Sequence, residues 1–75
     1  MMNLVIIGWK PGLKKISLAE LVQRQNHLGL KAAKDAVDGL LDGKEIHILC
    51  ADETEYRVVM EEIQRLGAVC KQAED

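Results

Sequence analysis

Residues 3–9 of this 75-residue chain read NLVIIGW and form a nearly continuous apolar run. The run is too short for a helix and rich in β-branched residues, so it predicts a strand that is buried on both faces. The turn-forming pair Pro11 and Gly12 follows shortly after its end. We therefore expect this strand at the centre of a sheet, with the rest of the chain supplying its neighbours and its cover.

Two helices are predicted directly after this turn. Ser17 and Glu20 have the spacing of a capping box, in which a hydroxyl and a carboxylate three residues apart satisfy the first free amides of a helix. Gly29 interrupts the helical pattern and lets the chain turn between two helices. The second helix covers about residues 30–41, and Gly43 is its C-terminal stop.

The second half of the chain predicts two strands separated by a third helix. Residues 45–50 (EIHILC) alternate in part between polar and apolar, and residues 68–73 (AVCKQA) form a last short strand. Asp52 and Glu55 repeat the capping pattern between them. The helix that they begin carries an apolar stripe made of Tyr56, Val59, Met60, Ile63 and Leu66.

The predicted order is strand, helix, helix, strand, helix, strand. The helical pair reverses the second strand and the third helix returns the chain, so a sheet of order 2-1-3 makes every neighbouring pair antiparallel. The fold class is therefore α+β, a two-layer sandwich in which three helices cover a three-stranded antiparallel sheet. Cys50 and Cys70 then lie on opposite edge strands, about 9–10 Å apart, which exceeds the reach of a disulfide.

The composition is that of one globular domain spanning residues 1–75, with 48% hydrophobic and 29% charged residues. The sequence has no secretory signal and no apolar stretch long enough to span a membrane, so we expect a cytoplasmic protein with reduced thiols. Trp9 and Tyr56 are its aromatic residues. Binding of single-stranded nucleic acid relies on aromatic stacking, so RNA is not the expected partner.

Catalysis is not expected from the titratable residues. His27 and His47 stand alone, the hydroxyls of Ser17 and Thr54 are explained as helix caps, and no glycine-rich phosphate loop follows the first strand. Neither cysteine has a second cysteine or a histidine at zinc-binding spacing, so no metal site is expected. A chain this short also has little room for a closed pocket, and we expect no cofactor.

Charge is divided unevenly along the chain, although the net charge is −2. Residues 1–34 contain six basic residues and one acidic residue, whereas residues 35–75 contain four basic and eleven acidic residues. Lys31 and Lys34 lie three residues apart, so they share one side of the second helix. The pattern fits either a basic contact face for an acidic partner or an ordinary solvated surface.

Residues 28–38, LGLKAAKDAVD, closely resemble the C-terminal domain of the bacterial ribosomal stalk protein, the large-subunit L-seven/L-twelve type. Members of that family carry the motif Gly-Leu-Gly-Leu-Lys-x-Ala-Lys-Asp-x-Val-Glu at this point. The likeness covers nearly the whole chain, with a few extra residues around the second strand. It implies the strand and helix order that is predicted above. The family's dimerisation segment and hinge have no counterpart in this sequence, so we expect either a free-standing homologue or an excised domain.

The resemblance also implies a function, because the family's domain docks translational GTPases, among them elongation factors G and Tu. It presents apolar and basic residues on its first two helices, so the implied partner is a protein with an acidic face. Glu20 and Gln23 stand where family members have basic residues, and His27 stands where they have glycine. The corresponding partner-binding residues of this chain are Lys15, Ile16, Ala19, Gly29, Lys31 and Lys34.

Two other functions compete with this interpretation. The Clp protease adaptor S family uses the same topology to capture N-terminal residues of substrates, but it needs an Asn-Asp pair after the first strand. Residues 8–15 (GWKPGLKK) contain no acid there. The other alternative is a helical pair that is merely solvated, or one that self-associates as a weak homodimer.

Overall fold

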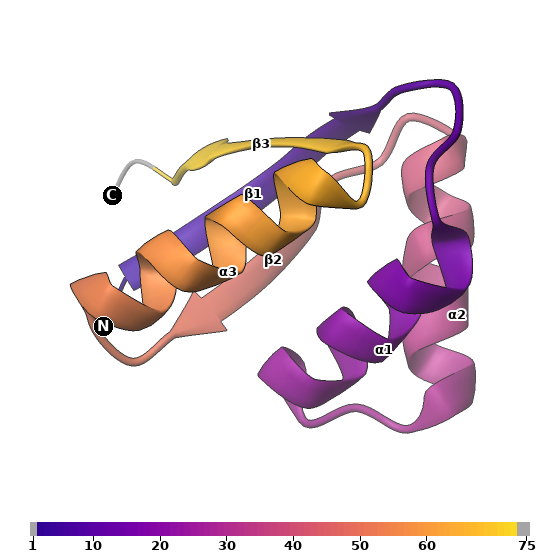
Figure 1. Cartoon of the computed structure of the whole chain (residues 1–75). Coiled ribbons are helices and arrows are strands. Elements are labelled where there is room, and N and C mark those ends of the chain that lie inside the picture. Colours follow the sequence, from indigo (N-terminus) through magenta and orange to yellow (C-terminus); the bar gives the residue numbers. More distant parts are fainter. Residues whose placement is uncertain (1, 74–75) are drawn as a thin grey trace.

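The computed structural model describes residues 2–73. Its strands and helices follow one another in the predicted succession (Figure 1). They are β1 (Met2–Trp9), α1 (Lys15–Asn26), α2 (Leu30–Leu41), β2 (Ile46–Cys50), α3 (Glu53–Arg65) and β3 (Ala68–Gln72).

β1 is the central strand of a three-stranded sheet with the order β2-β1-β3. Both neighbours run antiparallel to it, so that Ile6 lies between Ile46 on one side and Cys70 on the other. The register with β3 shifts between Ile6 and Gly8, which makes Ile7 the extra residue of a β-bulge. The predicted α+β class, sheet order and strand directions are therefore confirmed.

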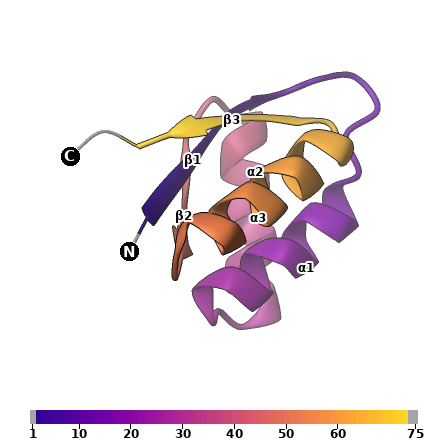
Figure 2. The same cartoon turned by 60° about the vertical axis from the view of Figure 1, so that its left-hand side comes forward.

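All three helices lie against the same face of the sheet (Figure 2). Along β2, Ile46, Ile48 and Cys50 point toward the helices and are buried, whereas His47 and Leu49 are exposed. The hydrophobic core fills the space between the two layers. It consists of Leu4, Ile6, Leu18, Ala19, Leu21, Val22, Ala33, Val37, Leu40, Ile46, Ile48, Cys50, Tyr56, Val59, Ile63 and Ala68.

The prediction that β1 is buried on both faces is correct for the middle of the strand and wrong for its end. Val5 lies on the face without helices and is still buried, flanked by its cross-strand neighbours His47 and Lys71. Ile7, however, is 41% exposed and Trp9 is 45% exposed. The reason is that both residues lie beyond Ile6, the last residue of β1 that pairs with β2, so no side chain of β2 lies beside them.

The capping box predicted at Ser17 is wrong. α1 begins at Lys15, Lys14 is its N-terminal cap residue, and no side chain bonds the first amides of the helix. The cause is a tertiary contact: the amide of Lys14 donates to the carbonyl of Leu66 at 3.0 Å. The loop before α1 is thereby held against the end of α3, and the chain enters the helix before it reaches Ser17.

The predicted end of α2 and the predicted start of α3 are confirmed. Gly43 has a left-handed backbone (φ +96°), and its amide donates to the Leu40 carbonyl at 3.0 Å, as in a glycine stop. Asp52 caps α3, because its carboxylate accepts a hydrogen bond from the Glu55 amide at 2.8 Å. The Glu55 carboxylate reaches back to the amide of Ala51 at 3.2 Å, one residue earlier than in a regular capping box.

The sequence predicts that Gly29 makes the turn between α1 and α2, and this prediction is wrong. His27 makes the turn. His27 has a left-handed backbone (φ 53°, ψ 43°), whereas Gly29 is extended (φ −69°, ψ 163°) and is the N-terminal cap residue of α2. A Cβ at Gly29 would meet no atom within 4 Å, so this position does not require glycine. Leu28 packs against the core, whereas Leu30 is 50% exposed.

Cys50 and Cys70 are free thiols, as their predicted separation requires. Cys50 is buried and Cys70 is half-buried. Burial raises the pKa of both thiols, so both are protonated at neutral pH. Among residues 2–73, no helix has the length and apolar character needed to cross a bilayer.

Candidate protein-docking surface

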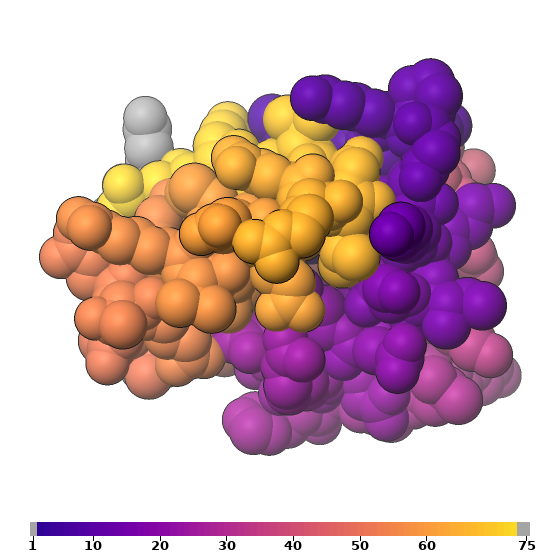
Figure 3. Space-filling model, viewed as in Figure 1, coloured from indigo at the N-terminus to yellow at the C-terminus, as the bar shows by residue number. Residues whose placement is uncertain are grey.

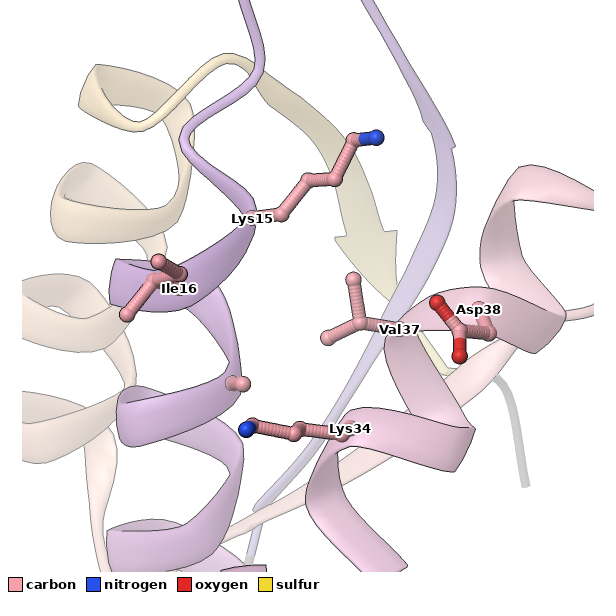
Figure 4. A pocket seen from close by; sticks show the side chains of 6 residues that line it. Lys15, Ile16, Lys34, Val37 and Asp38 are labelled. Atoms are coloured by element: carbon pink, nitrogen blue, oxygen red, sulfur yellow. The ribbon is translucent and has the colours of Figure 1, made fainter. Parts of the chain in front are cut away.

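A hollow of about 150 Å³ opens between α1 and α2. We call it the α1–α2 hollow, and its lining residues are Lys15, Ile16, Ala19, Lys34, Val37 and Asp38. Figure 4 shows Lys34 extending from α2 toward α1, with Val37 and Lys15 facing the same space. α1 and α2 therefore form one concave surface together.

The α1–α2 hollow has an apolar floor and a charged rim. Ala19 and Val37 are buried because they also belong to the hydrophobic core. Ile16, by contrast, is 75% exposed, and Lys15 and Lys34 are exposed on either side of the hollow. Transferring an exposed isoleucine side chain out of water is worth about 1.5–3 kcal/mol, which a partner covering this hollow would gain.

The structure brings together four of the six partner-binding residues expected from the sequence, namely Lys15, Ile16, Ala19 and Lys34. Lys31 does not line the hollow and is exposed on α2 about one turn earlier. Gly29 does not line it either, because it caps the start of α2.

Two residues of the hollow, Val37 and Asp38, are not among those expected from the sequence. Val37 serves both the core and the hollow. Asp38 lies four residues after Lys34, and residues at this spacing share one side of a helix. That spacing is the signal that identifies Asp38. Its carboxylate gives the rim one negative charge beside two positive ones.

Arg24 and Glu20 complete the charge pattern of α1. The guanidinium of Arg24 pairs with the carboxylate of Glu62 on α3 at 3.0 Å, so it is directed toward α3 and away from α2. Both partners are partly exposed, and such a pair contributes little to stability. Glu20 is exposed and lies four residues after Ile16, on the same side of α1.

A second hollow, of about 310 Å³, lies where the end of α1 meets the end of β2, and its lining includes Gln25, Cys50 and Glu55. The Gln25 amide donates to the Glu55 carboxylate at 2.7 Å. Burial, and then the negative charges of Glu55 and Asp52, raise the pKa of the Cys50 thiol, so it is a poor nucleophile at neutral pH. Within residues 2–73, no three side chains of His, Cys, Asp or Glu come together as a metal site would need.

Comparisons of the chain with protein-family models, with curated proteins and with solved structures found no match. The functional interpretation therefore rests on the geometry of the α1–α2 hollow and on the sequence of residues 28–38.

Proposed function

We propose that this chain is a non-catalytic protein-interaction module that docks the acidic face of a partner protein in the α1–α2 hollow. The partner class that we favour is a translational GTPase, because residues 28–38 resemble the ribosomal stalk domain that binds such factors through its first two helices. The observation that carries the proposal is the convergence of Lys15, Ile16 and Lys34 on one hollow. Such a partner implies a cytoplasmic location.

An exposed aliphatic side chain between two lysines is suited to this kind of contact. Ile16 would form the buried centre of the interface, where most of the binding free energy of protein complexes is concentrated. Lys15 and Lys34 would orient an acidic partner and raise the rate of association, and their contribution would fall as salt screens it. Asp38 would face a basic or polar group of the partner.

The direct test is a nuclear magnetic resonance titration of the isotope-labelled chain with bacterial elongation factors G and Tu. Under the proposal, the backbone signals that shift first belong to the α1–α2 hollow, and the affinity decreases with increasing salt. Signals that shift on α3 or on the open face of the sheet, or no shift with either factor, would contradict docking at this surface.

Charge-reversal variants show whether the lysines act as proposed. We expect the double variant Lys15→Glu, Lys34→Glu to weaken binding by at least about tenfold, because two attractive contacts with an acidic face become repulsive. Each single variant, Lys15→Glu or Lys34→Glu, is compared with Lys44→Glu as the matched control, because Lys44 is exposed, lies outside the hollow and undergoes the same charge change as each of them. Equal losses for the control and for either hollow lysine would refute a local charge contact.

A gain of affinity provides a sharper test than a loss. Glu20 is the acidic residue that shares the side of α1 with Ile16. We expect Glu20→Lys to tighten binding several-fold, since it removes one repulsion from an acidic partner and adds one attraction. Weaker binding by this variant would show that the partner's face is not acidic.

A further inference from the structure

The two edges of the sheet differ in how they are closed. At the β2 edge, the Asn26 side chain donates to the His47 carbonyl at 2.8 Å and accepts from the Leu49 amide at 3.3 Å. Gln25 adds a longer contact to the Leu49 carbonyl at 3.4 Å. The end of α1 therefore occupies the backbone groups that another strand would use. β3 forms the opposite edge of the sheet.

The register shows which backbone groups of β3 point away from the sheet. In an antiparallel ladder, successive residues turn their amide and carbonyl alternately to one side and the other. The Asn3 carbonyl accepts from the Ala73 amide at 3.0 Å, so Asn3 faces β3, and by alternation Val5 and its partner Lys71 face each other. Cys70 and Gln72 therefore turn their backbone groups outward, and no side chain among residues 2–73 bonds them.

The sequence of β3 suits pairing with a second copy of itself. If two β3 strands run antiparallel and Cys70 lies opposite Cys70 of the second copy, the outward backbone groups on both strands meet. Lys71, the charged residue of β3, then lies opposite Val69 of the other copy. Centring the pair on Lys71 instead would place two ammonium groups opposite each other, which is unfavourable.

α3 carries a charge pattern that is complementary to itself. The side of α3 that faces α1 is marked by Glu55 and Glu62, which bond Gln25 and Arg24. The exposed side of α3 has charges of alternating sign at four-residue spacing, and these residues are Glu53, Arg57, Glu61 and Arg65. Within one helix, Arg57 pairs with Glu53 at 2.7 Å and Arg65 pairs with Glu61 at 2.9 Å. In two antiparallel copies of α3 centred on the middle of this stripe, each Arg57 would face Glu61, and each Glu53 would face Arg65.

The positions of α3 and β3 allow both contacts to form together. α3 packs more closely on β3 than on β2, whereas α1 packs on β2. In the space-filling view, α3 and β3 occupy the left and centre of the face, and α1 lies below and to the right (Figure 3). A twofold axis that pairs two β3 strands would therefore also bring the two α3 helices near each other.

We propose that two copies of this chain associate symmetrically through β3 and α3. Their sheets join into one antiparallel sheet of six strands, with β3 against β3 at the centre and the α3 helices antiparallel beside the same axis. The α1–α2 hollow lies outside this interface, so each dimer would present two hollows. Dimerisation does not depend on the proposed docking function and is tested without any partner.

The test uses two charge-reversal variants and their mixture in sedimentation equilibrium. Chain concentrations reach about 1 mM, where half of the chains are dimeric if the dissociation constant of the dimer is about 1 mM. Arg57→Glu alone and Glu61→Arg alone each bring like charges together, and we expect each to weaken the dimer by at least about tenfold. In an equimolar mixture, each Glu at position 57 faces an Arg at position 61 of the other variant. The mixture should therefore dimerise as well as the original chain.

Three results would overturn the proposal. A chain that is monomeric up to about 1 mM shows that the edge does not pair at relevant strength. If both single variants still dimerise, the interface lies elsewhere. Loss of the dimer in Leu49→Arg would then place the interface on the open sheet face, and loss in Ile16→Asp would place it at the α1–α2 hollow. Failure of the mixture to recover dimers would refute the antiparallel α3 contact.

Lys44→Glu is the matched control for Arg57→Glu, and circular dichroism checks that each variant is folded.

Discussion

At the scale of single residues, His27 carries the least favourable backbone conformation that the fold requires. Its left-handed φ of 53° costs a residue with a Cβ about 1–2 kcal/mol, and its exposed side chain gains little packing in return. We expect His27→Gly to raise the free energy of unfolding by about 0.5–1 kcal/mol in urea denaturation, after allowing for the greater freedom of glycine in the unfolded chain. His27→Ala keeps the Cβ, so an equal gain in that variant would contradict the backbone explanation.

Gly67 and Gly43 separate conformational cost from steric cost. Their φ angles are nearly equal, +97° and +96°, but a Cβ on Gly67 would stand 3.2 Å from the Leu13 Cα, whereas one on Gly43 would meet no atom within 4 Å. Both alanine variants lose unfolding free energy, because alanine is strained in a left-handed backbone. We expect Gly67→Ala to lose about 1 kcal/mol more unfolding free energy than Gly43→Ala, measured by calorimetry, because only Gly67→Ala displaces the loop before α1. Equal losses of unfolding free energy in the two variants would show that the loop before α1 moves away from the added Cβ at no measurable cost.

The same residues show how far the sequence predicts local backbone conformation. Gly43 and Gly67 can be identified because a glycine that follows an apolar helical stripe is itself the signal of a C-terminal stop. His27 cannot, since histidine is not a residue that left-handed turns select, and Gly29 two residues later is the more conventional choice. The conformation is decided by the tertiary fit of α1 against α2, which no local pattern contains.

At the scale of elements, Asn26 closes the outer edge of β2. Its side chain makes one donated and one accepted hydrogen bond to that edge. Native proteins protect such edges because an open edge is a template for pairing with another chain. We expect Asn26→Ala to lower the unfolding free energy by about 1–2 kcal/mol and to speed hydrogen exchange of the Leu49 amide.

Asn3→Ala is the matched control for this change, because Asn3 is exposed on β1 and its side chain makes no hydrogen bond to residues 2–73. The control should leave both the stability and the exchange of the Leu49 amide within about 0.5 kcal/mol of the original chain. Unchanged exchange of Leu49 in Asn26→Ala would show that the side-chain contact does not close the edge.

Two helix starts show which element boundaries the sequence predicts. α3 begins where Asp52 caps it, because the capping carboxylate and the amide that it accepts from are only three residues apart. The N-terminal cap residue of α1 is Lys14, three residues before the predicted cap Ser17, because the amide of Lys14 is bound by the carbonyl of Leu66, far along the chain. Boundaries set by local hydrogen bonds are therefore predictable here, and a boundary set by a distant carbonyl is not.

At the scale of the whole molecule, the candidate site shows a similar division. Helical periodicity assigns Lys15 and Ile16 to one helix and Lys34 to the next, but whether they meet depends on how the two helices cross. The crossing brings Lys34 over the hollow and leaves Lys31 one turn away from it. The sheet order, in contrast, follows from the element order and the connections alone, and it is confirmed in full.

The core as a whole should make the protein sensitive to alkali. Burial raises the pKa of Cys50, Cys70 and Tyr56. The carboxylates of Glu55 and Asp52 raise the pKa of Cys50 further, and the thiols of Cys70 and Cys50, once ionised, raise that of Tyr56 further. Each group therefore holds its proton more tightly in the folded chain than in the unfolded chain. The stability that this contributes is fully present at neutral pH and is lost as the pH rises above about 9, because the unfolded chain ionises first.

We expect the free energy of unfolding in urea to fall between pH 8 and pH 11, with the steepest part above about pH 9. The slope of the original chain is compared with that of the triple variant Cys50→Ala, Cys70→Ala, Tyr56→Phe. The variant should be less stable at pH 7, because cavities replace the sulfur atoms, but its stability should depend less on pH. An equally steep decline in the variant would show that the alkaline loss does not come from the two thiols and the Tyr56 phenol.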